Sequence, residues 1–119
     1  AIHHADQLSV PDLMRKLQDL VQRVRRGMLR SSEMMDATVT LTALGERGVE
    51  QVFGVIYPPQ VAIIGFGSIN ARPWAVDDAL AIRPIMNMTL AADHRVSDGH
   101  RGALFLAAIT HYLQQPDQL

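Results

Sequence analysis

The sequence predicts an α/β domain in which a mixed β-sheet is flanked by helices, and three observations support that prediction. Residues 10–29 repeat apolar side chains at helical spacing. Residues 37–42 and 60–65 are rich in the β-branched and apolar residues that favour strands. Residues 99–114 form a second helical pattern after another strand-like run. At 119 residues, the chain is long enough for one domain with a single core, which we assign to residues 1–119.

The first expected helix, residues 10–29, is amphipathic. Ser9 precedes it as a capping residue, Pro11 lies in its first turn, and Asp12 follows three residues after the serine. Its apolar stripe consists of Leu13, Leu17, Leu20, Val24 and Met28. We expect this stripe to pack on the sheet.

The strands are expected in the middle of the chain. Residues 37–42 alternate in the manner of a half-buried strand, whereas residues 60–65 are hydrophobic nearly throughout and should be covered on both faces. A bend is expected around Gly65 to Pro73. A hairpin should follow, with residues 76–79 at its turn and residues 80–92 as one return strand, in which Pro84 favours an edge or a bulge.

Composition excludes several classes of function. The formal net charge of -1 gives no reason to expect attraction to nucleic acid, and the absence of cysteine removes disulfides and thiolate chemistry. No apolar run is long enough to cross a bilayer. We therefore expect a soluble, intracellular protein. The abrupt start of the chain also suggests that it was cut from a longer one.

The strongest functional candidate is the segment Asp93–Gly99, between a strand-like run and the last helix. His94 there can act as a general base near neutral pH. Asp98 can orient the loop, and Gly99 either permits a backbone conformation that a Cβ would resist or allows a close approach at the start of the helix. The structural alternative is a loop histidine followed by an aspartate that caps the helix. The other histidines lack ligand spacing, so we expect no metal site.

This segment closely resembles the His-x-x-x-Asp-Gly signature of the acyltransferases of 2-oxoacid dehydrogenase complexes, which share the chloramphenicol-acetyltransferase fold. The resemblance continues in residues 58–65 (PPQVAIIG), in residues 72–73 (RP) and in residues 38–45 (TVTLTALG). It covers essentially the whole chain in the correct order. A catalytic domain of that family is about twice as long, so the resemblance implies a C-terminal half.

The resemblance also implies roles for particular residues. His94 would be the base that deprotonates a thiol of coenzyme A or of a dihydrolipoyl group, and Thr42 would donate a hydrogen bond to the oxyanion. Asp98 would fix the loop. The family builds its sites between subunits of a trimer, so the implied partners are further copies of the chain, other subunits of the complex and a lipoyl group on a separate domain. Such complexes lie in the bacterial cytoplasm or the mitochondrial matrix.

Two departures from the family pattern lie near Thr42: Ala43 and Tyr57 stand where asparagines are usual. Three functions stay open from the sequence. The first is acyl transfer between thiols, and the second is acylation of a hydroxyl in the manner of chloramphenicol acetyltransferase. The third is a non-catalytic module that forms the trimeric scaffold of a multienzyme core.

Overall fold

The computed structural model describes residues 1–118. Its helices are α1 (Val10–Arg25), α2 (Ser31–Met34) and α3 (Gly99–Leu113). Its strands are β1 (Val39–Ala43), β2 (Ala62–Phe66), β3 (Asn70–Val76), β4 (Ala79–Ile85) and β5 (Met88–Ala92). Single turns of 3-10 helix lie at Ala5–Gln7, Gly45–Arg47 and Pro116–Gln118. The prediction of a mixed sheet with flanking helices is confirmed.

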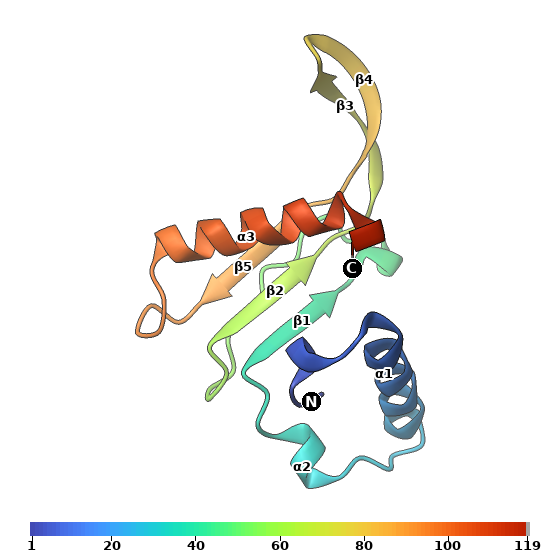
Figure 1. Cartoon of the computed structure of the whole chain (residues 1–119), viewed down its shortest axis with the longest axis vertical. Coiled ribbons are helices and arrows are strands. Elements are labelled where there is room, and N and C mark those ends of the chain that lie inside the picture. The colour runs from blue at the N-terminus through green and yellow to red at the C-terminus, as the bar shows by residue number, and fades with distance from the viewer. Residues whose placement is uncertain (119) are drawn as a thin grey trace.

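The main sheet has three strands in the order β1-β2-β5, with β1 parallel and β5 antiparallel to β2. Helix α3 lies across one face of this sheet (Figure 1). Its inward positions, Gly102, Leu106 and Ile109, recur at helical spacing and are less exposed than their neighbours. On β2, Ile64 is only 2% exposed. The prediction that the second strand is covered on both faces is thus confirmed at its centre.

An extended segment, residues 49–57, covers the other face of the sheet. Its backbone approaches β2 and the residue after it so closely that a Cβ at Gly67 would lie 1.9 Å from the carbonyl oxygen of Glu50. A Cβ at Gly65 would lie 2.5 Å from the carbonyl oxygen of Val52. The hydroxyl of Thr89 on β5 donates a hydrogen bond to that same carbonyl. The two glycines are therefore explained by packing of the extended segment on the sheet.

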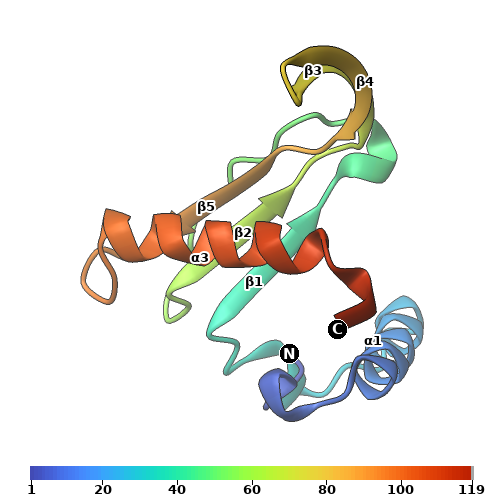
Figure 2. The same cartoon turned by 45° about the horizontal axis from the view of Figure 1, so that its top comes forward.

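The hairpin formed by β3 and β4 is a separate two-stranded sheet that projects from the body (Figures 1 and 2). Asp77 and Asp78 form its turn with φ of 50° and 62°, the left-handed values that a two-residue hairpin turn needs. The predicted turn is confirmed, but the single return strand is wrong. Residues 80–92 divide between β4 and β5, which pair in different sheets. Pro73, expected at a bend, lies inside β3.

Helix α1 begins as predicted, since Ser9 accepts a hydrogen bond from the backbone N–H of Asp12 at 3.3 Å. It ends at Arg25, four residues earlier than expected, and its apolar stripe does not pack on the sheet. The helix lies to the side of β1 (Figure 1), and Leu17 is 40% and Val24 50% exposed. The expected packing is wrong because α1 lies beside the edge strand β1 rather than over a face of the sheet (Figure 1).

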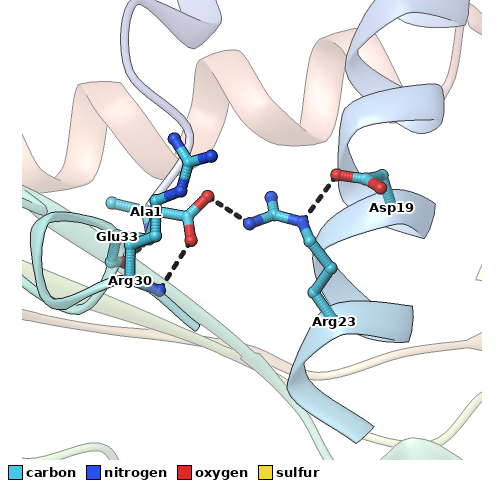
Figure 3. Close-up of polar contacts among 5 residues, drawn as sticks. All are labelled: Ala1, Asp19, Arg23, Arg30 and Glu33. Carbon is cyan, nitrogen blue, oxygen red and sulfur yellow. Dashed lines mark hydrogen bonds and ion pairs between the residues drawn. The ribbon is translucent and has the colours of Figure 1, made fainter. Parts of the chain in front are cut away.

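Polar contacts hold α1 to the segment that follows it (Figure 3). Arg23 binds Asp19 at 2.8 Å within the helix and Glu33 of α2 at 2.5 Å. Glu33 also accepts from the backbone N–H of Arg30 at 2.9 Å, and its backbone carbonyl accepts from the amino group of Ala1. The Arg23 guanidinium keeps the pKa of the Glu33 carboxyl below its ordinary value. This cluster connects α1 and α2 by charge rather than by an apolar core.

The chain exposes far more surface than its mass requires. Its accessible area is 9492 Å², whereas a compact monomer of 13.2 kDa exposes roughly 6,400 Å². Its radius of gyration is 16.4 Å, compared with about 13.5 Å for a compact chain of this length. Among the described residues, no helix is both long and apolar enough to cross a membrane.

Candidate active site at the start of helix α3

The loop between β5 and α3 is organised by Asp93. Its backbone N–H donates to the carbonyl of Val61 at 2.8 Å, which continues the pairing of β5 with the chain before β2. Its own carbonyl accepts from the N–H groups of Val96 and Ser97 at 2.9 and 3.0 Å. Its carboxylate accepts from the Arg95 backbone N–H at 2.9 Å and from the guanidinium at 2.7 Å. The loop thus closes around Asp93.

The charge state of Asp93 follows from these contacts. Hydrogen bonds from the side chain and then the backbone of Arg95 stabilise the ionised form and lower the pKa of the Asp93 carboxyl to about 2. The same pair raises the pKa of the Arg95 guanidinium. Both groups therefore stay charged at neutral pH. They fix the loop that presents the next side chain, His94.

His94 is exposed at the edge of a hollow of about 350 Å³ between β5 and α3. The hollow is lined by Leu90, Ala92, His94, Ser97, Asp98, Gly99, Gly102, Ala103 and Leu106. The imidazole makes no hydrogen bond within residues 1–118, so both ring nitrogens are open to a ligand. An exposed imidazole beside an apolar hollow can accept a proton from a bound thiol or hydroxyl.

Asp98 caps α3, because its carboxylate accepts from the backbone N–H of Arg101 at 2.8 Å. This contact confirms the capping interpretation of Asp98 and fixes the end of the loop at the same time. The expectation that Gly99 is needed for its backbone conformation or for a close approach is wrong. Gly99 has no left-handed φ, and a Cβ there would meet nothing within 4 Å among the described residues.

Thr42 lies near the end of β1, on the opposite face of the sheet. It pairs with Gly65, which pairs with Thr89, so these three residues point to the same side. That side is covered by the extended segment 49–57, as the hydrogen bond from Thr89 to the Val52 carbonyl shows. Leu90, the next residue on β5, faces the hollow and α3. Thr42 and the hollow at His94 therefore lie on opposite faces.

The two residues are also far apart along the sheet. Thr42 is in register with Thr89, two strands away, while the loop at Asp93 begins four residues further along β5. At about 4.8 Å between strands and about 3.3 Å per residue, the Thr42 and Asp93 backbones are separated by about 16 Å. One chain therefore does not bring His94 and Thr42 to one reacting group.

The sequence did not single out Asp93 and Arg95 as the residues that shape the loop. The available signal was an aspartate at a strand end with an arginine two residues later, a spacing that allows an Asx-type turn. Among residues 1–118, no three histidine or carboxylate side chains gather as they would around a metal ion.

Fold and site together define an α/β domain with an exposed histidine on a capped loop beside an apolar hollow. The family model for the 2-oxoacid dehydrogenases acyltransferase (catalytic domain) matches residues 1–119. The chain belongs to this family. The resemblance read from the sequence is thereby confirmed.

Individual relatives agree with this assignment. The dihydrolipoyllysine-residue acetyltransferase component of the pyruvate dehydrogenase complex of Zymomonas mobilis is 36% identical over 115 residues, which cover 97% of this chain and 26% of that protein. A probable dihydrolipoamide acetyltransferase from Listeria monocytogenes superposes with a TM-score of 0.89 at 35% identity, over 96% of this chain and 49% of that one. The acetyltransferase of Azotobacter vinelandii gives 0.83 at 29% identity, over 91% and 44%. The chain thus spans about half the length of the solved chains it matches.

Proposed function

We propose that this chain contributes to the transfer of an acyl group between the thiols of dihydrolipoamide and coenzyme A. The observation that carries the proposal is the position of His94, held by the Asp93 loop at the edge of an apolar hollow. Within such a system the partners are a lipoyl group on a separate domain, coenzyme A and other subunits of a 2-oxoacid dehydrogenase complex.

The chemistry needs one base and one oxyanion donor. His94 accepts the proton of the attacking thiol, and the resulting thiolate adds to the thioester carbonyl. The Thr42 hydroxyl donates a hydrogen bond to the tetrahedral oxyanion, which then expels the second thiolate. That thiolate takes the proton back from the imidazolium, so the enzyme returns to its starting state. A thiol with a pKa near 8.5 needs only modest help from a base near neutrality.

The spacing of these residues supports the assignment. The Azotobacter structure belongs to crystallographic and enzymatic work on the catalytic roles of a serine, a histidine and an asparagine. In that protein's numbering, the serine precedes the histidine by fifty-two positions and the asparagine follows it by four. Thr42, His94 and Asp98 stand at the same separations in this sequence. Thr42 has a hydroxyl where that protein has the hydroxyl of serine, whereas Asp98 has a carboxylic acid where that protein has the amide of asparagine.

The opposite placement of Thr42 and His94 favours a site shared between copies of the chain. A second copy can bring its own His94 to the Thr42 face of the first. Such an arrangement needs no movement of either residue within its own chain. We therefore propose a homotrimer or a multiple of it, as the family resemblance implies.

The test is transfer of an acetyl group from S-acetyl-dihydrolipoamide to coenzyme A by the purified chain. Replacing His94 with alanine should lower the rate by 10²- to 10⁴-fold, roughly the contribution of a general base. Thr42→Ala should lower it by about 10²- to 10³-fold, as is typical for an oxyanion donor. The matched control is His100→Ala, since His100 is also exposed at the start of α3 but does not line the hollow. Equal activity in all four proteins would refute the assignment of His94.

A non-catalytic scaffold module is the second candidate, favoured by the chain's match to only half of the solved domains. It predicts that the wild-type chain assembles but transfers no acyl group. His94→Ala would then leave both the mass of the assembly and the absent activity unchanged. An active wild-type chain excludes this candidate.

A further inference from the structure

The loop before α3 folds as one helical turn that brings a second hydroxyl close to His94. The carbonyl of Asp93 accepts from the backbone N–H groups of Val96 at 2.9 Å and Ser97 at 3.0 Å, as in a single turn of helix. Residues three apart in such a turn share one side, with about 5–6 Å between their Cβ atoms. His94 and Ser97 have this spacing, and both line the hollow between β5 and α3. One chain therefore places a base and a hydroxyl together, although it keeps His94 and Thr42 apart.

The hydroxyl of Ser97 is only weakly held. The side chain is half-buried, and its one hydrogen bond within residues 1–118 is a donation to the backbone carbonyl of Asp98 at 3.4 Å. That distance is long for an O–H donor, so the bond costs little to break. The backbone of Ser97 is fixed by its N–H bond to Asp93. A change of rotamer therefore turns the hydroxyl without moving the loop.

We propose that His94 and Ser97 form a second catalytic pair within one chain, which hydrolyses acyl thioesters through an acyl-serine intermediate. The pair rests on the proposed function for its substrate class, the acyl thioester. His94 takes the proton of the Ser97 hydroxyl as the serine oxygen adds to the thioester carbonyl carbon. The C–S bond then breaks, and the leaving thiolate takes that proton from the imidazolium. Water attacks the acyl-serine with His94 as base again, the bond between the carbonyl carbon and the serine oxygen breaks, a carboxylic acid leaves, and the proton returns to the serine oxygen.

The surroundings of the pair suit this chemistry. Leu90, Ala92 and Leu106 supply apolar walls for an acyl chain, and the volume of about 350 Å³ is within the range of pockets that hold small ligands. Gly99 also lines the hollow, and it is the first residue of α3. Its N–H has no partner within the helix and is available to a developing oxyanion. The pair therefore has an oxyanion donor without a second copy.

The first test asks whether residue 97 shares a proton with His94, and it does not depend on catalysis. The chain contains no cysteine, so Ser97→Cys introduces a single thiol. The matched control is Val96→Cys in the same loop, because Val96 is 60% exposed and residues two apart in a helical turn do not face each other. A histidine beside a thiol favours the reactive thiolate, so iodoacetamide should alkylate the thiol at 97 at least about tenfold faster than the thiol at 96. Adding His94→Ala should remove this difference.

The second test is hydrolysis of acetyl-coenzyme A by the chain with no acceptor thiol present. Acid quenching should trap an acetyl group on the peptide that contains Ser97. Ser97→Ala and His94→Ala should each lower the rate at least about tenfold, and the double variant should be no slower than either, because residues that act as one unit are not additive. Ser32→Ala, in α2, should match the wild type. The rate per chain should not change with chain concentration, because the pair lies within one copy.

Several results would overturn the proposal. These are alkylation at 97 no faster than at 96, hydrolysis no faster than without protein, hydrolysis that survives Ser97→Ala, or additive losses in the double variant at unchanged melting temperature. The proposed function is measured separately, as acetyl-coenzyme A formed from S-acetyl-dihydrolipoamide. Transfer without an acyl-serine would refute the catalytic pair alone. An acyl-serine without transfer would refute the proposed function and leave the pair standing.

Discussion

Mixing two inactive variants tests whether the site is shared between copies. Thr42→Ala keeps His94, and His94→Ala keeps Thr42, so each variant alone contains no complete site. Within one chain, the two positions lie on opposite faces of the sheet and about 16 Å apart along it. A base and an oxyanion donor must both lie within hydrogen-bond reach of one reacting group. Activity in the mixture must therefore come from sites built by two different copies.

The expected activity of the mixture follows from the fraction of sites that receive both an intact Thr42 and an intact His94. When the two variants are unfolded together in equal amounts and refolded, each subunit position receives either variant with equal chance. A site is intact only when the copy that supplies the hydroxyl carries Thr42 and its neighbour carries His94. Independent choice at the two positions makes about one quarter of the sites intact. We expect about one quarter of the wild-type rate, far above the residual rate of either variant.

The assay is release of coenzyme A thiol or of dihydrolipoamide thiol at a fixed total chain concentration. The control mixes His94→Ala with the double variant, because that mixture contains no His94 and so cannot form an intact site. Sedimentation must show the same assembly mass in both mixtures. A rate in the test mixture no higher than the mean of the separate variants, with assembly intact, would refute the shared site.

Three further predictions concern stability. Gly67→Ala should destabilise the fold by several kcal/mol, because its Cβ would lie 1.9 Å from the Glu50 carbonyl oxygen. Gly102→Ala in α3 should be neutral or stabilising by up to about 1 kcal/mol. Urea unfolding of the two variants and the wild type compares their free energies of unfolding. The pKa of Asp93, lowered from 3.8 to about 2, makes its stabilising contribution present above pH 4 and lost as pH falls to 2. The difference in melting temperature between wild type and Asp93→Asn should vanish over that window. Glu33→Gln should loosen α1 from α2 and hasten proteolysis of residues 26–36, with melting of the sheet little changed.

Local patterns in the sequence predicted the individual elements well. Helical spacing placed α1 and α3, period-2 alternation placed β1, and a nearly continuous apolar run placed β2, each to within a few residues. The hairpin turn was predicted at residues 76–79, and Asp77 and Asp78 adopt there the left-handed conformation that aspartate tolerates. These features depend on neighbouring residues only. The predicted capping by Ser9 was correct for the same reason.

Features that depend on distant partners could not be read in this way. The run of residues 80–92 is continuous in composition, yet its two halves pair with β3 and β2 in separate sheets. The stripe on α1 is amphipathic, but the sequence does not state which surface faces it. The side to which Thr42 points follows from its register with Gly65, and register is set by the assembled sheet. A list of candidate site residues therefore left their relative placement open.

The placement of the two half-sites also restricts how copies can assemble. In a two-fold dimer the same patch contacts itself, so both pairs of Thr42 and His94 would have to meet across one interface. The opposite faces of the sheet prevent one chain from presenting both residues to one neighbour. In the proposed shared site, each chain would instead offer Thr42 to one neighbour and His94 to another, which is a head-to-tail contact. Where the rotation between neighbours closes, such contacts form a ring of at least three copies, which is the smallest assembly compatible with the proposed shared site.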